Sequence, residues 1–204
     1  MGKFEKYIEK DGKRMRYGYT TGSCATAASK GAATMLLSGE RRNAITIDTP
    51  KGWQLAIDLY DIEMTAEAVT CSVIKDAGDD PDVTDGMRVF ATVRRQTEPG
   101  VTFKGGPGVG RVTLSGLSIP VGEPAINPTP RAMMRRELAV VAKDFGYTGG
   151  FEVTIAMPEG IELAKRTFNP KLGVVGGLSV IGTSGVVTPM SADQIGRASC
   201  RERV

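Results

Sequence analysis

The segment Thr20-Thr21-Gly22-Ser23 places several hydroxyl side chains directly before a run rich in alanine. This pattern predicts the start of a helix, where unpaired backbone N–H groups and the positive end of the helix dipole favour an anion. A carboxylate or a phosphate would be bound well there. The segment is also typical of a plain helix start in which Thr21 or Ser23 is the N-cap and Gly22 a turn residue, and both interpretations stay open.

Four aspartates stand within seven residues between Asp76 and Asp82. Crowded carboxylates repel one another, so this loop needs a cation, hydroxyl donors or open water around it. Its glycine and acidic spacings do not fit a calcium-binding loop. A solvated turn after a strand is the simpler interpretation.

The glycine-rich segment from Gly105 to Arg111 is a third candidate, because its backbone amides could surround an anion beside the arginine. It lacks the context of a dinucleotide fingerprint and the Gly-Lys-Ser/Thr sequence of a nucleoside triphosphatase loop. Glu123, Asn127 and Arg131 follow among three prolines, which restrict the backbone and hold polar side chains at fixed angles. A purely structural loop would use prolines in the same way.

Histidine is absent, which removes the commonest general base and any Ser-His-Asp or Cys-His machinery. The three cysteines, Cys24, Cys71 and Cys200, form no paired spacing, so we predict neither a disulfide framework nor a zinc site. Cys24 at a helix start is a possible nucleophile. No partner base is visible for it, and we favour a small buried cysteine packed against a sheet.

The chain has 204 residues, 41% of them hydrophobic, which fits a globular protein with one good core or two small ones. No apolar stretch is long enough for a membrane span or a secretory signal, so we expect a cytoplasmic protein. We interpret 195–204 as a non-native tail and 1–194 as the domain. Without this tail the net charge falls from +3 to +1, which removes the electrostatic case for nucleic acid.

The order of the elements favours an α+β fold, with a mixed sheet and packed helices, over a doubly wound sheet. We expect helices from the Thr/Ser start to Gly39, from about Pro130 to Phe145, and around 159–167. We expect an irregular region over 101–130 and a buried strand with a glycine turn over 174–187. The predicted strands are Ala44–Thr49, Leu55–Ile62, Ala68–Ile74, Met87–Arg95 and Phe151–Met157.

Four long motifs carry a resemblance to a known family: RYGYTTGSCATAA at 16–28, VIKDAGDDPDVT at 73–84, GPGVGRVTLSGLSIPVGEPAINPTPR at 106–131 and GGLSVIGTSGVVTPMS at 176–191. In this order they resemble the cobalt-precorrin-5B methyltransferases of the CbiD type. The resemblance implies methyl transfer from S-adenosylmethionine to carbon 1 of the macrocycle, giving cobalt-precorrin-6A. It also implies a domain like domain 2 of ribosomal protein S5, followed by a Rossmann-like part that is largely missing, because the chain stops where family members continue.

The substrate implied by the resemblance carries several carboxylates, which match the candidate anion sites. We therefore assign substrate contacts to Thr20, Thr21, Gly22, Ser23, Gly108, Gly110, Arg111, Glu123, Asn127 and Arg131. The acidic loop would repel that substrate, so we expect Asp79 or Asp80 to face the methyl donor, or else the loop to order Lys75 and neighbouring arginines. Donor contacts are assigned to Asp76, Gly78, Asp79, Asp80, Thr183, Ser184 and Gly185.

We expect cobalt to arrive within the substrate and not to be bound by the protein. The central prediction is that the four motifs meet in space and form one half of a tetrapyrrole pocket. A small-molecule kinase similar to galactokinase and homoserine kinase is a second hypothesis, although the Pro-x-x-x-Gly-Leu-Gly-Ser-Ser-Ala pattern of those kinases is absent. A third is a non-catalytic tetrapyrrole-binding module. The oligomeric state is not predicted.

Overall fold

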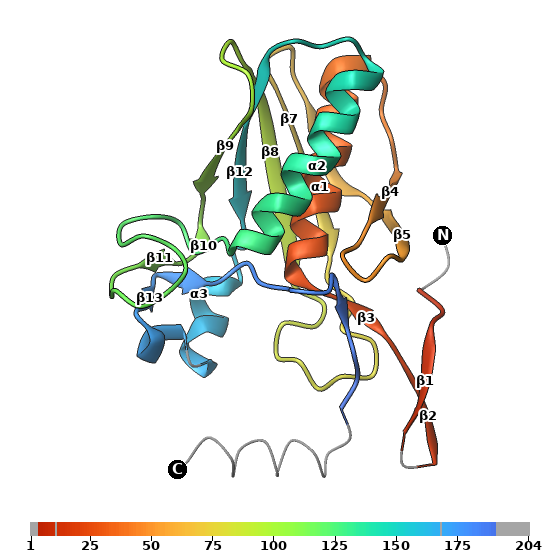
Figure 1. Cartoon of the computed structure of the whole chain (residues 1–204), viewed down its shortest axis with the longest axis vertical. Coiled ribbons are helices and arrows are strands. Elements are labelled where there is room, and N and C mark those ends of the chain that lie inside the picture. The colour runs from red at the N-terminus through yellow and green to blue at the C-terminus, as the bar shows by residue number, and fades with distance from the viewer. Residues whose placement is uncertain (1–3, 11, 168, 191–204) are drawn as a thin grey trace.

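A five-stranded sheet and two long helices form the centre of the molecule (Figure 1). The computed structural model describes residues 4–10, 12–167 and 169–190. The sheet order is β6-β7-β8-β12-β9, with all neighbours antiparallel except the parallel pair β12 and β9. Its strands are β6 (Tyr60–Met64), β7 (Ala68–Ile74), β8 (Arg88–Gln96), β9 (Val101–Gly105) and β12 (Gly150–Ala156).

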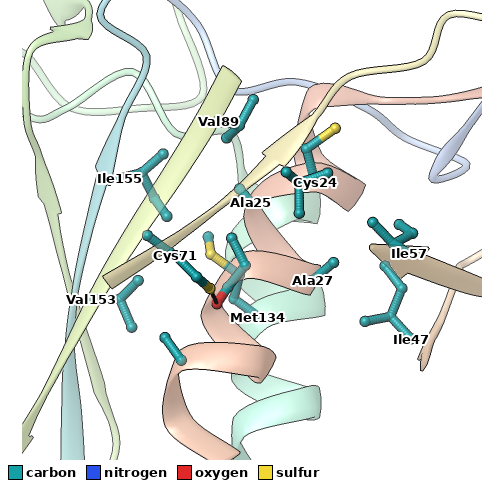
Figure 2. Packing of buried hydrophobic residues seen from close by; sticks show 14 of the residues in the cluster. Cys24, Ala25, Ala27, Ile47, Ile57, Cys71, Val89, Met134, Val153 and Ile155 are labelled. Carbon is teal, nitrogen blue, oxygen red and sulfur yellow. Dashed lines mark hydrogen bonds between the residues drawn. The ribbon is translucent and has the colours of Figure 1, made fainter. Parts of the chain in front are cut away.

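Helix α1 (Thr21–Ser38) packs directly on β7 and β8, and helix α2 (Pro128–Asp144) packs on α1 (Figure 1). The small residues of α1 allow this close approach, since its alanines are buried against the sheet. Figure 2 shows one consequence, in which the Cys71 thiol donates a hydrogen bond of 3.2 Å to the Ala28 carbonyl. The core therefore lies between the helices and one face of the sheet.

Buried charges also join the two helices. Glu137 of α2 is almost fully buried, and its carboxylate lies 2.8 Å from the Lys30 ammonium of α1. The same carboxylate accepts the backbone N–H of Asp48 at 3.0 Å. Because removing Lys30 would take a cation away from the buried Glu137 carboxylate, this pair helps to fix how α2 sits on α1.

Short paired strands and turns complete the fold. The hairpin β1–β2 extends away from the body (Figure 1). The remaining elements are β1 (Tyr7–Lys10), β2 (Lys13–Arg16), β3 (Gly18–Tyr19), β4 (Ala44–Asp48), β5 (Gln54–Asp58), β10 (Gly108–Val109), β11 (Arg111–Val112), α3 (Gly160–Leu163), the 3-10 turns Ala164–Arg166 and Asn169–Leu172, β13 (Val174–Val175), β14 (Gly177–Leu178) and β15 (Val186–Val187). Their pairs are β4–β5, β3–β15, β10–β14 and β11–β13.

The α+β class is confirmed, and so are the two long helices and most predicted strands. The single strand predicted over Leu55–Ile62 is wrong, because the chain leaves the β4–β5 pair after Asp58 and joins the main sheet at Tyr60. The region 101–130 is also more regular than predicted, since β9 pairs with β12. The likeness to the S5 domain and the Rossmann-like part stay predictions, and the tail at 195–204 lies outside the described residues.

Several strand ends, helix starts and loops lie at one end of the molecule. Strands β7, β9 and β12 end there, and both α1 and α2 begin there (Figure 1). The loop that joins β7 to β8 and the segment 176–187 lie at the same end. Within the part of the chain that the structure describes, no helix combines the length and apolarity needed to cross a membrane.

Candidate functional site

A cavity of about 420 Å³ lies at this end, and all four sequence motifs contribute to its lining. Thr20 and Thr21 come from the start of α1, Asn127 from the residue before α2, and Ser179 from the last motif. Lys75 comes from the loop after β7. The predicted meeting of the four motifs is therefore observed, and three of the predicted substrate residues, Thr20, Thr21 and Asn127, line the cavity.

The segment 176–187 ties the start of α1 in place. The backbone N–H of Gly22 donates to the Ile181 carbonyl at 2.8 Å. The Ser23 hydroxyl donates to the Gly185 carbonyl at 2.5 Å, and the Ser23 amide donates to Thr20 Oγ1 at 3.2 Å. Thr20 is thus the N-cap, not Thr21 or Ser23 as the plain interpretation had it. The predicted ligand contacts of Gly22 and Ser23 would compete with these protein partners.

The same segment also ties in the start of α2 and the glycine-rich segment. The backbone N–H of Asn127 donates to the Val180 carbonyl at 3.0 Å, and that of Val180 donates to the Ala125 carbonyl at 2.8 Å. The Gly110 amide donates to the Leu178 carbonyl at 2.9 Å. Residues that are distant in sequence are therefore held in one place by backbone hydrogen bonds.

Most carboxylates of the acidic loop have partners within the protein. Asp76 forms a two-pronged ion pair with Arg16, with both N–O distances 2.7 Å, and accepts the Gly78 amide. Asp79 accepts the backbone N–H of Arg16 at 2.6 Å, and Asp80 accepts that of Met190 at 3.1 Å. The loop thus orders Arg16, which is the second of its two predicted roles. Asp76, Gly78, Asp79 and Asp80 are not among the residues that line the cavity.

Asp82 is the aspartate of this group that lines the cavity, and it is paired with a buried lysine. The Lys75 ammonium, only 2% exposed, lies 2.6 Å from the carboxylate, whose side chain is 28% exposed. Asp82 also accepts the Thr84 amide and hydroxyl at 2.8 and 2.7 Å. Burial alone would raise the pKa of Asp82, but the hydrogen bonds from Lys75 and Thr84 outweigh it and lower this pKa, so the carboxylate stays charged.

Neither Asp82 nor Thr84 was predicted as a site residue, and Lys75 was predicted only as a residue that the loop orders. Lys75 directly follows the apolar strand β7, which is the one sequence signal for its burial. A lysine at the end of a buried strand needs a nearby carboxylate. The acidic loop supplies that carboxylate, but the sequence does not show which of its aspartates is near enough.

Gly108 and Gly110 have a structural reason to be glycine, and neither lines the cavity. Gly108 has a φ of +77°, and a Cβ there would overlap the Met157 carbonyl oxygen. A Cβ at Gly110 would overlap the Val174 side chain. Their predicted contact with substrate stays a prediction, because the close approach of neighbouring backbones accounts for both glycines.

The predicted arginines are bound to nearby carbonyl groups. Arg111 is exposed, and its guanidinium donates to the Gly122 carbonyl. Arg131 donates to the Ile126 carbonyl at 2.8 Å and lies 3.5 Å from the Glu123 carboxylate. This carboxylate offsets the unfavourable placement of a cation near the start of a helix. Arg111, Glu123 and Arg131 are outside the lining of the cavity.

Three residues of the last motif were predicted to contact the methyl donor, and one of them holds the start of α1. The Gly185 carbonyl accepts the backbone N–H of Thr20 at 3.2 Å. The Ser184 hydroxyl donates to the carbonyl of nearby Val186 at 2.8 Å. Thr183 is exposed. None of the three lines the cavity, and their contact with a methyl donor stays a prediction.

Large apolar side chains surround the opening of the cavity. Val83, Leu117, Leu172 and Ile181 all line it, and they are between 37% and 56% exposed. We call these four residues the apolar rim. Exposed apolar residues from four separate segments around one cavity are typical of a surface that a ligand or another protein segment covers.

Cys24 is not a nucleophile in this fold. It is fully buried, and burial raises the pKa of its thiol to about 12, although the nearby Lys75 ammonium opposes this shift. The prediction of a buried cysteine packed in the core is confirmed (Figure 2). Within the described residues, no three His, Cys, Asp or Glu side chains gather in a way that could hold a metal ion.

Comparison with known proteins assigns the family. The family model for CbiD matches residues 8–189. The chain belongs to the CbiD family. It is 53% identical over 189 residues to a cobalt-precorrin-5B C(1)-methyltransferase of Alkaliphilus metalliredigens, covering 93% of this chain and 49% of that protein. It is 52% identical over 187 residues to the protein of the same name from Ruminiclostridium cellulolyticum, with 92% and 48% covered.

A solved CbiD structure has a similar fold. The crystal structure of the cobalamin biosynthesis protein CbiD from Archaeoglobus fulgidus matches with a TM-score of 0.69 and 30% sequence identity. The match covers 93% of this chain and 60% of that one. The chain spans about half the length of the curated CbiD relatives it matches.

Proposed function

We propose that this chain forms one half of a methyltransferase that transfers a methyl group from S-adenosylmethionine to a ring carbon of cobalt-precorrin-5B, giving cobalt-precorrin-6A in the cytoplasm. The observation that carries the proposal is the shared cavity, since all four motifs of the CbiD resemblance line it. The names of the relatives support the reaction. The remaining half of a CbiD protein would complete the pocket.

The lining of the cavity suits a flat ring with carboxylate arms. The apolar rim offers contact to the face of a macrocycle, and the hydroxyl and amide groups of Thr20, Thr21 and Asn127 offer donors to its arms. Both helices begin at this cavity, so their dipoles favour the negative charge of those arms. The cobalt is part of the substrate and needs no ligand from the protein.

The chemistry needs orientation more than proton transfer. The methyl carbon of the sulfonium is an electrophile, and the electron-rich ring carbon supplies the electron pair for the new C–C bond. The C–S bond breaks, its electron pair stays on sulfur as a thioether, and the positive charge passes to the methylated ring. Holding both reactants in line can supply a large part of the rate, and a protein without histidine can do this.

The test is methyl transfer by a CbiD protein of full family length that carries these residues. With methyl-labelled S-adenosylmethionine and cobalt-precorrin-5B, we expect the label to appear in the corrinoid. Corrinoid binding without donor binding or labelling would instead support the non-catalytic tetrapyrrole-binding module. Absence of corrinoid binding would contradict both.

A matched pair of variants tests the rim. Ile181→Glu places a charge on the apolar rim, whereas Ile161→Glu changes a similarly exposed isoleucine that does not line the cavity. We expect the first to raise KM about tenfold or more, the scale of one lost apolar contact, and the second to leave KM unchanged. Equal effects would show that the rim does not contact the substrate.

A further inference from the structure

The side chain of Thr21 is buried and has no hydrogen-bond partner in the part of the chain that the structure describes. The residue is 6% exposed and lines the cavity. Among residues 4–10, 12–167 and 169–190, no hydrogen-bond partner is found for its side chain. A buried polar group without a partner destabilises a protein, so its presence calls for an explanation such as a ligand.

The other buried hydroxyls of the same helix are all satisfied. Thr26 donates to the Gly22 carbonyl at 2.8 Å, and Ser23 donates to the Gly185 carbonyl at 2.5 Å. Ser29 lies 3.4 Å from the Met134 sulfur. Thr21 differs from them in facing the cavity, which indicates that its partner comes from there.

Asn127 offers a second group at the start of the other helix. It is the N-cap residue of α2, yet its side chain makes no capping hydrogen bond, and it lines the same cavity. Positions 128 and 130 are prolines, which have no backbone N–H for the Asn127 side chain to cap. Its amide is therefore available to a ligand.

The charges around these groups define the kind of ligand. The Lys75 ammonium lies in the same lining, and the Asp82 carboxylate balances its charge. Two helix starts remain, each equivalent to about half a positive charge. The sum is about one positive charge, which matches a single carboxylate better than a phosphate dianion.

We propose that Thr21, Asn127 and Lys75 form a subsite for one carboxylate group of a ligand. The hydroxyl and the amide donate hydrogen bonds to the carboxylate, and the two helix starts supply the net positive charge. The Lys75 ammonium lies in the same lining, with its charge balanced by Asp82. This inference rests on the proposed function only for the source of the carboxylate. It is either a side arm of the tetrapyrrole or the amino-acid end of S-adenosylmethionine, because both carry the same chemistry.

The decisive variant is Thr21→Val, which removes the hydroxyl and keeps the shape. Because none of the described residues is a hydrogen-bond partner of this buried hydroxyl, we expect the melting temperature of the free protein to rise by about 2–4 °C. The matched control is Thr26→Val on the same helix, which removes a satisfied hydrogen bond and should not raise it. A melting temperature that falls for Thr21→Val would overturn the inference.

Ligand binding supplies the second measurement, made with a CbiD protein of full family length. Cobyrinic acid carries carboxylate arms and cobinamide carries amides, while S-adenosylhomocysteine carries a carboxylate that 5′-methylthioadenosine lacks. In one of these pairs, we expect Thr21→Val and Asn127→Ala to weaken the binding of the compound that carries the carboxylate about tenfold, which is the scale of one hydrogen bond to a charged group. The binding of the other compound of that pair should not change. The affected pair identifies the source. Equal changes within both pairs, or none, would contradict the subsite.

A failure of the proposed function is distinguishable from a failure of the subsite. Wild-type protein that binds none of the four compounds would contradict the proposed function. The subsite is then tested with acetate alone, followed through the NMR shift of the backbone amide at position 21. A saturable shift that Thr21→Val abolishes would support the subsite, and the absence of such a shift would overturn it.

Discussion

The acidic loop, from Lys75 to Asp85, and the glycine-rich segment, from Gly105 to Arg111, both have the composition of ligand-binding loops, but the protein uses them in opposite ways. The acidic loop is held by charge, with Asp76 paired to Arg16 and Asp82 paired to Lys75. The glycine-rich segment is held by the absence of side chains, because Gly108 lies against the Met157 backbone. Only the acidic loop places a charged side chain in the cavity.

This difference teaches that the composition of a loop does not by itself locate a site. Aspartates and glycines can be fully used by the fold that they stabilise. Among the residues that the structure describes, Thr21 and Asn127 line the cavity from the two helix starts and have no protein partner for their side chains. Stability measurements can separate the two uses.

The largest effect should come from Gly108→Ala. The added methyl group meets the Met157 carbonyl oxygen, and alanine is strained at the φ of +77°. We expect a loss of about 4 kcal/mol in the free energy of unfolding, measured with urea. Gly122→Ala is the control, because its φ is +89° but nothing lies within 4 Å, so about 1–2 kcal/mol is expected. Equal losses would show that close backbone packing does not explain Gly108.

Asp82→Ala should cause the next largest loss of stability. It leaves the Lys75 ammonium buried without its carboxylate, and we expect a loss of about 3 kcal/mol in unfolding free energy. Asp79→Ala in the same loop removes one hydrogen bond at the surface and should cost about 1 kcal/mol. If the two variants were equally stable, the loop would not be organised by its buried ion pair.

Most of the architecture could be predicted from the sequence, because hydrophobic period and helix signals are local. The glycine at position 39 marks the end of α1, where its backbone adopts a φ of +71°. Long-range pairing is not visible in the same way. The run from Leu55 to Ile62 alternates as one strand would, yet its two halves pair with different partners, and only tertiary contacts decide that.

The candidate site could be predicted as a meeting of motifs but not residue by residue. Hydroxyls at a helix start are visible in the sequence, so Thr20 and Thr21 could be predicted as site residues. Which aspartate of the loop pairs with Lys75 depends on distances of a few ångströms, and the sequence carries no signal for them. The apolar rim was missed for the same reason, since Val83, Leu117 and Leu172 become neighbours only in the fold.

A smaller effect is expected on the way in which stability depends on acid pH, and it should come from the Lys75–Asp82 pair. In the folded protein the pKa of Asp82 lies below its ordinary value of 3.8. Its contribution to stability is therefore complete above that value and is lost as the pH falls through the lowered pKa of the folded state. In the variant Lys75→Met/Asp82→Leu, both charges are gone, and we expect the unfolding free energy to fall less steeply with decreasing pH below about 4. An unchanged slope in urea titrations would assign acid lability to other groups.

The smallest effect is expected for Arg111→Gln, and it bears most directly on the difference between the two loops. Arg111 is exposed, and its contact with the Gly122 carbonyl is a surface interaction, so the unfolding free energy should change by no more than about 0.5 kcal/mol. Because the side chain does not line the cavity, the affinity for cobyrinic acid should stay the same in a CbiD protein of full family length. Calorimetry would check this. A weaker affinity at unchanged stability would mean that the guanidinium reaches a carboxylate arm outside the cavity, and the glycine-rich segment would then belong to the binding site together with the acidic loop.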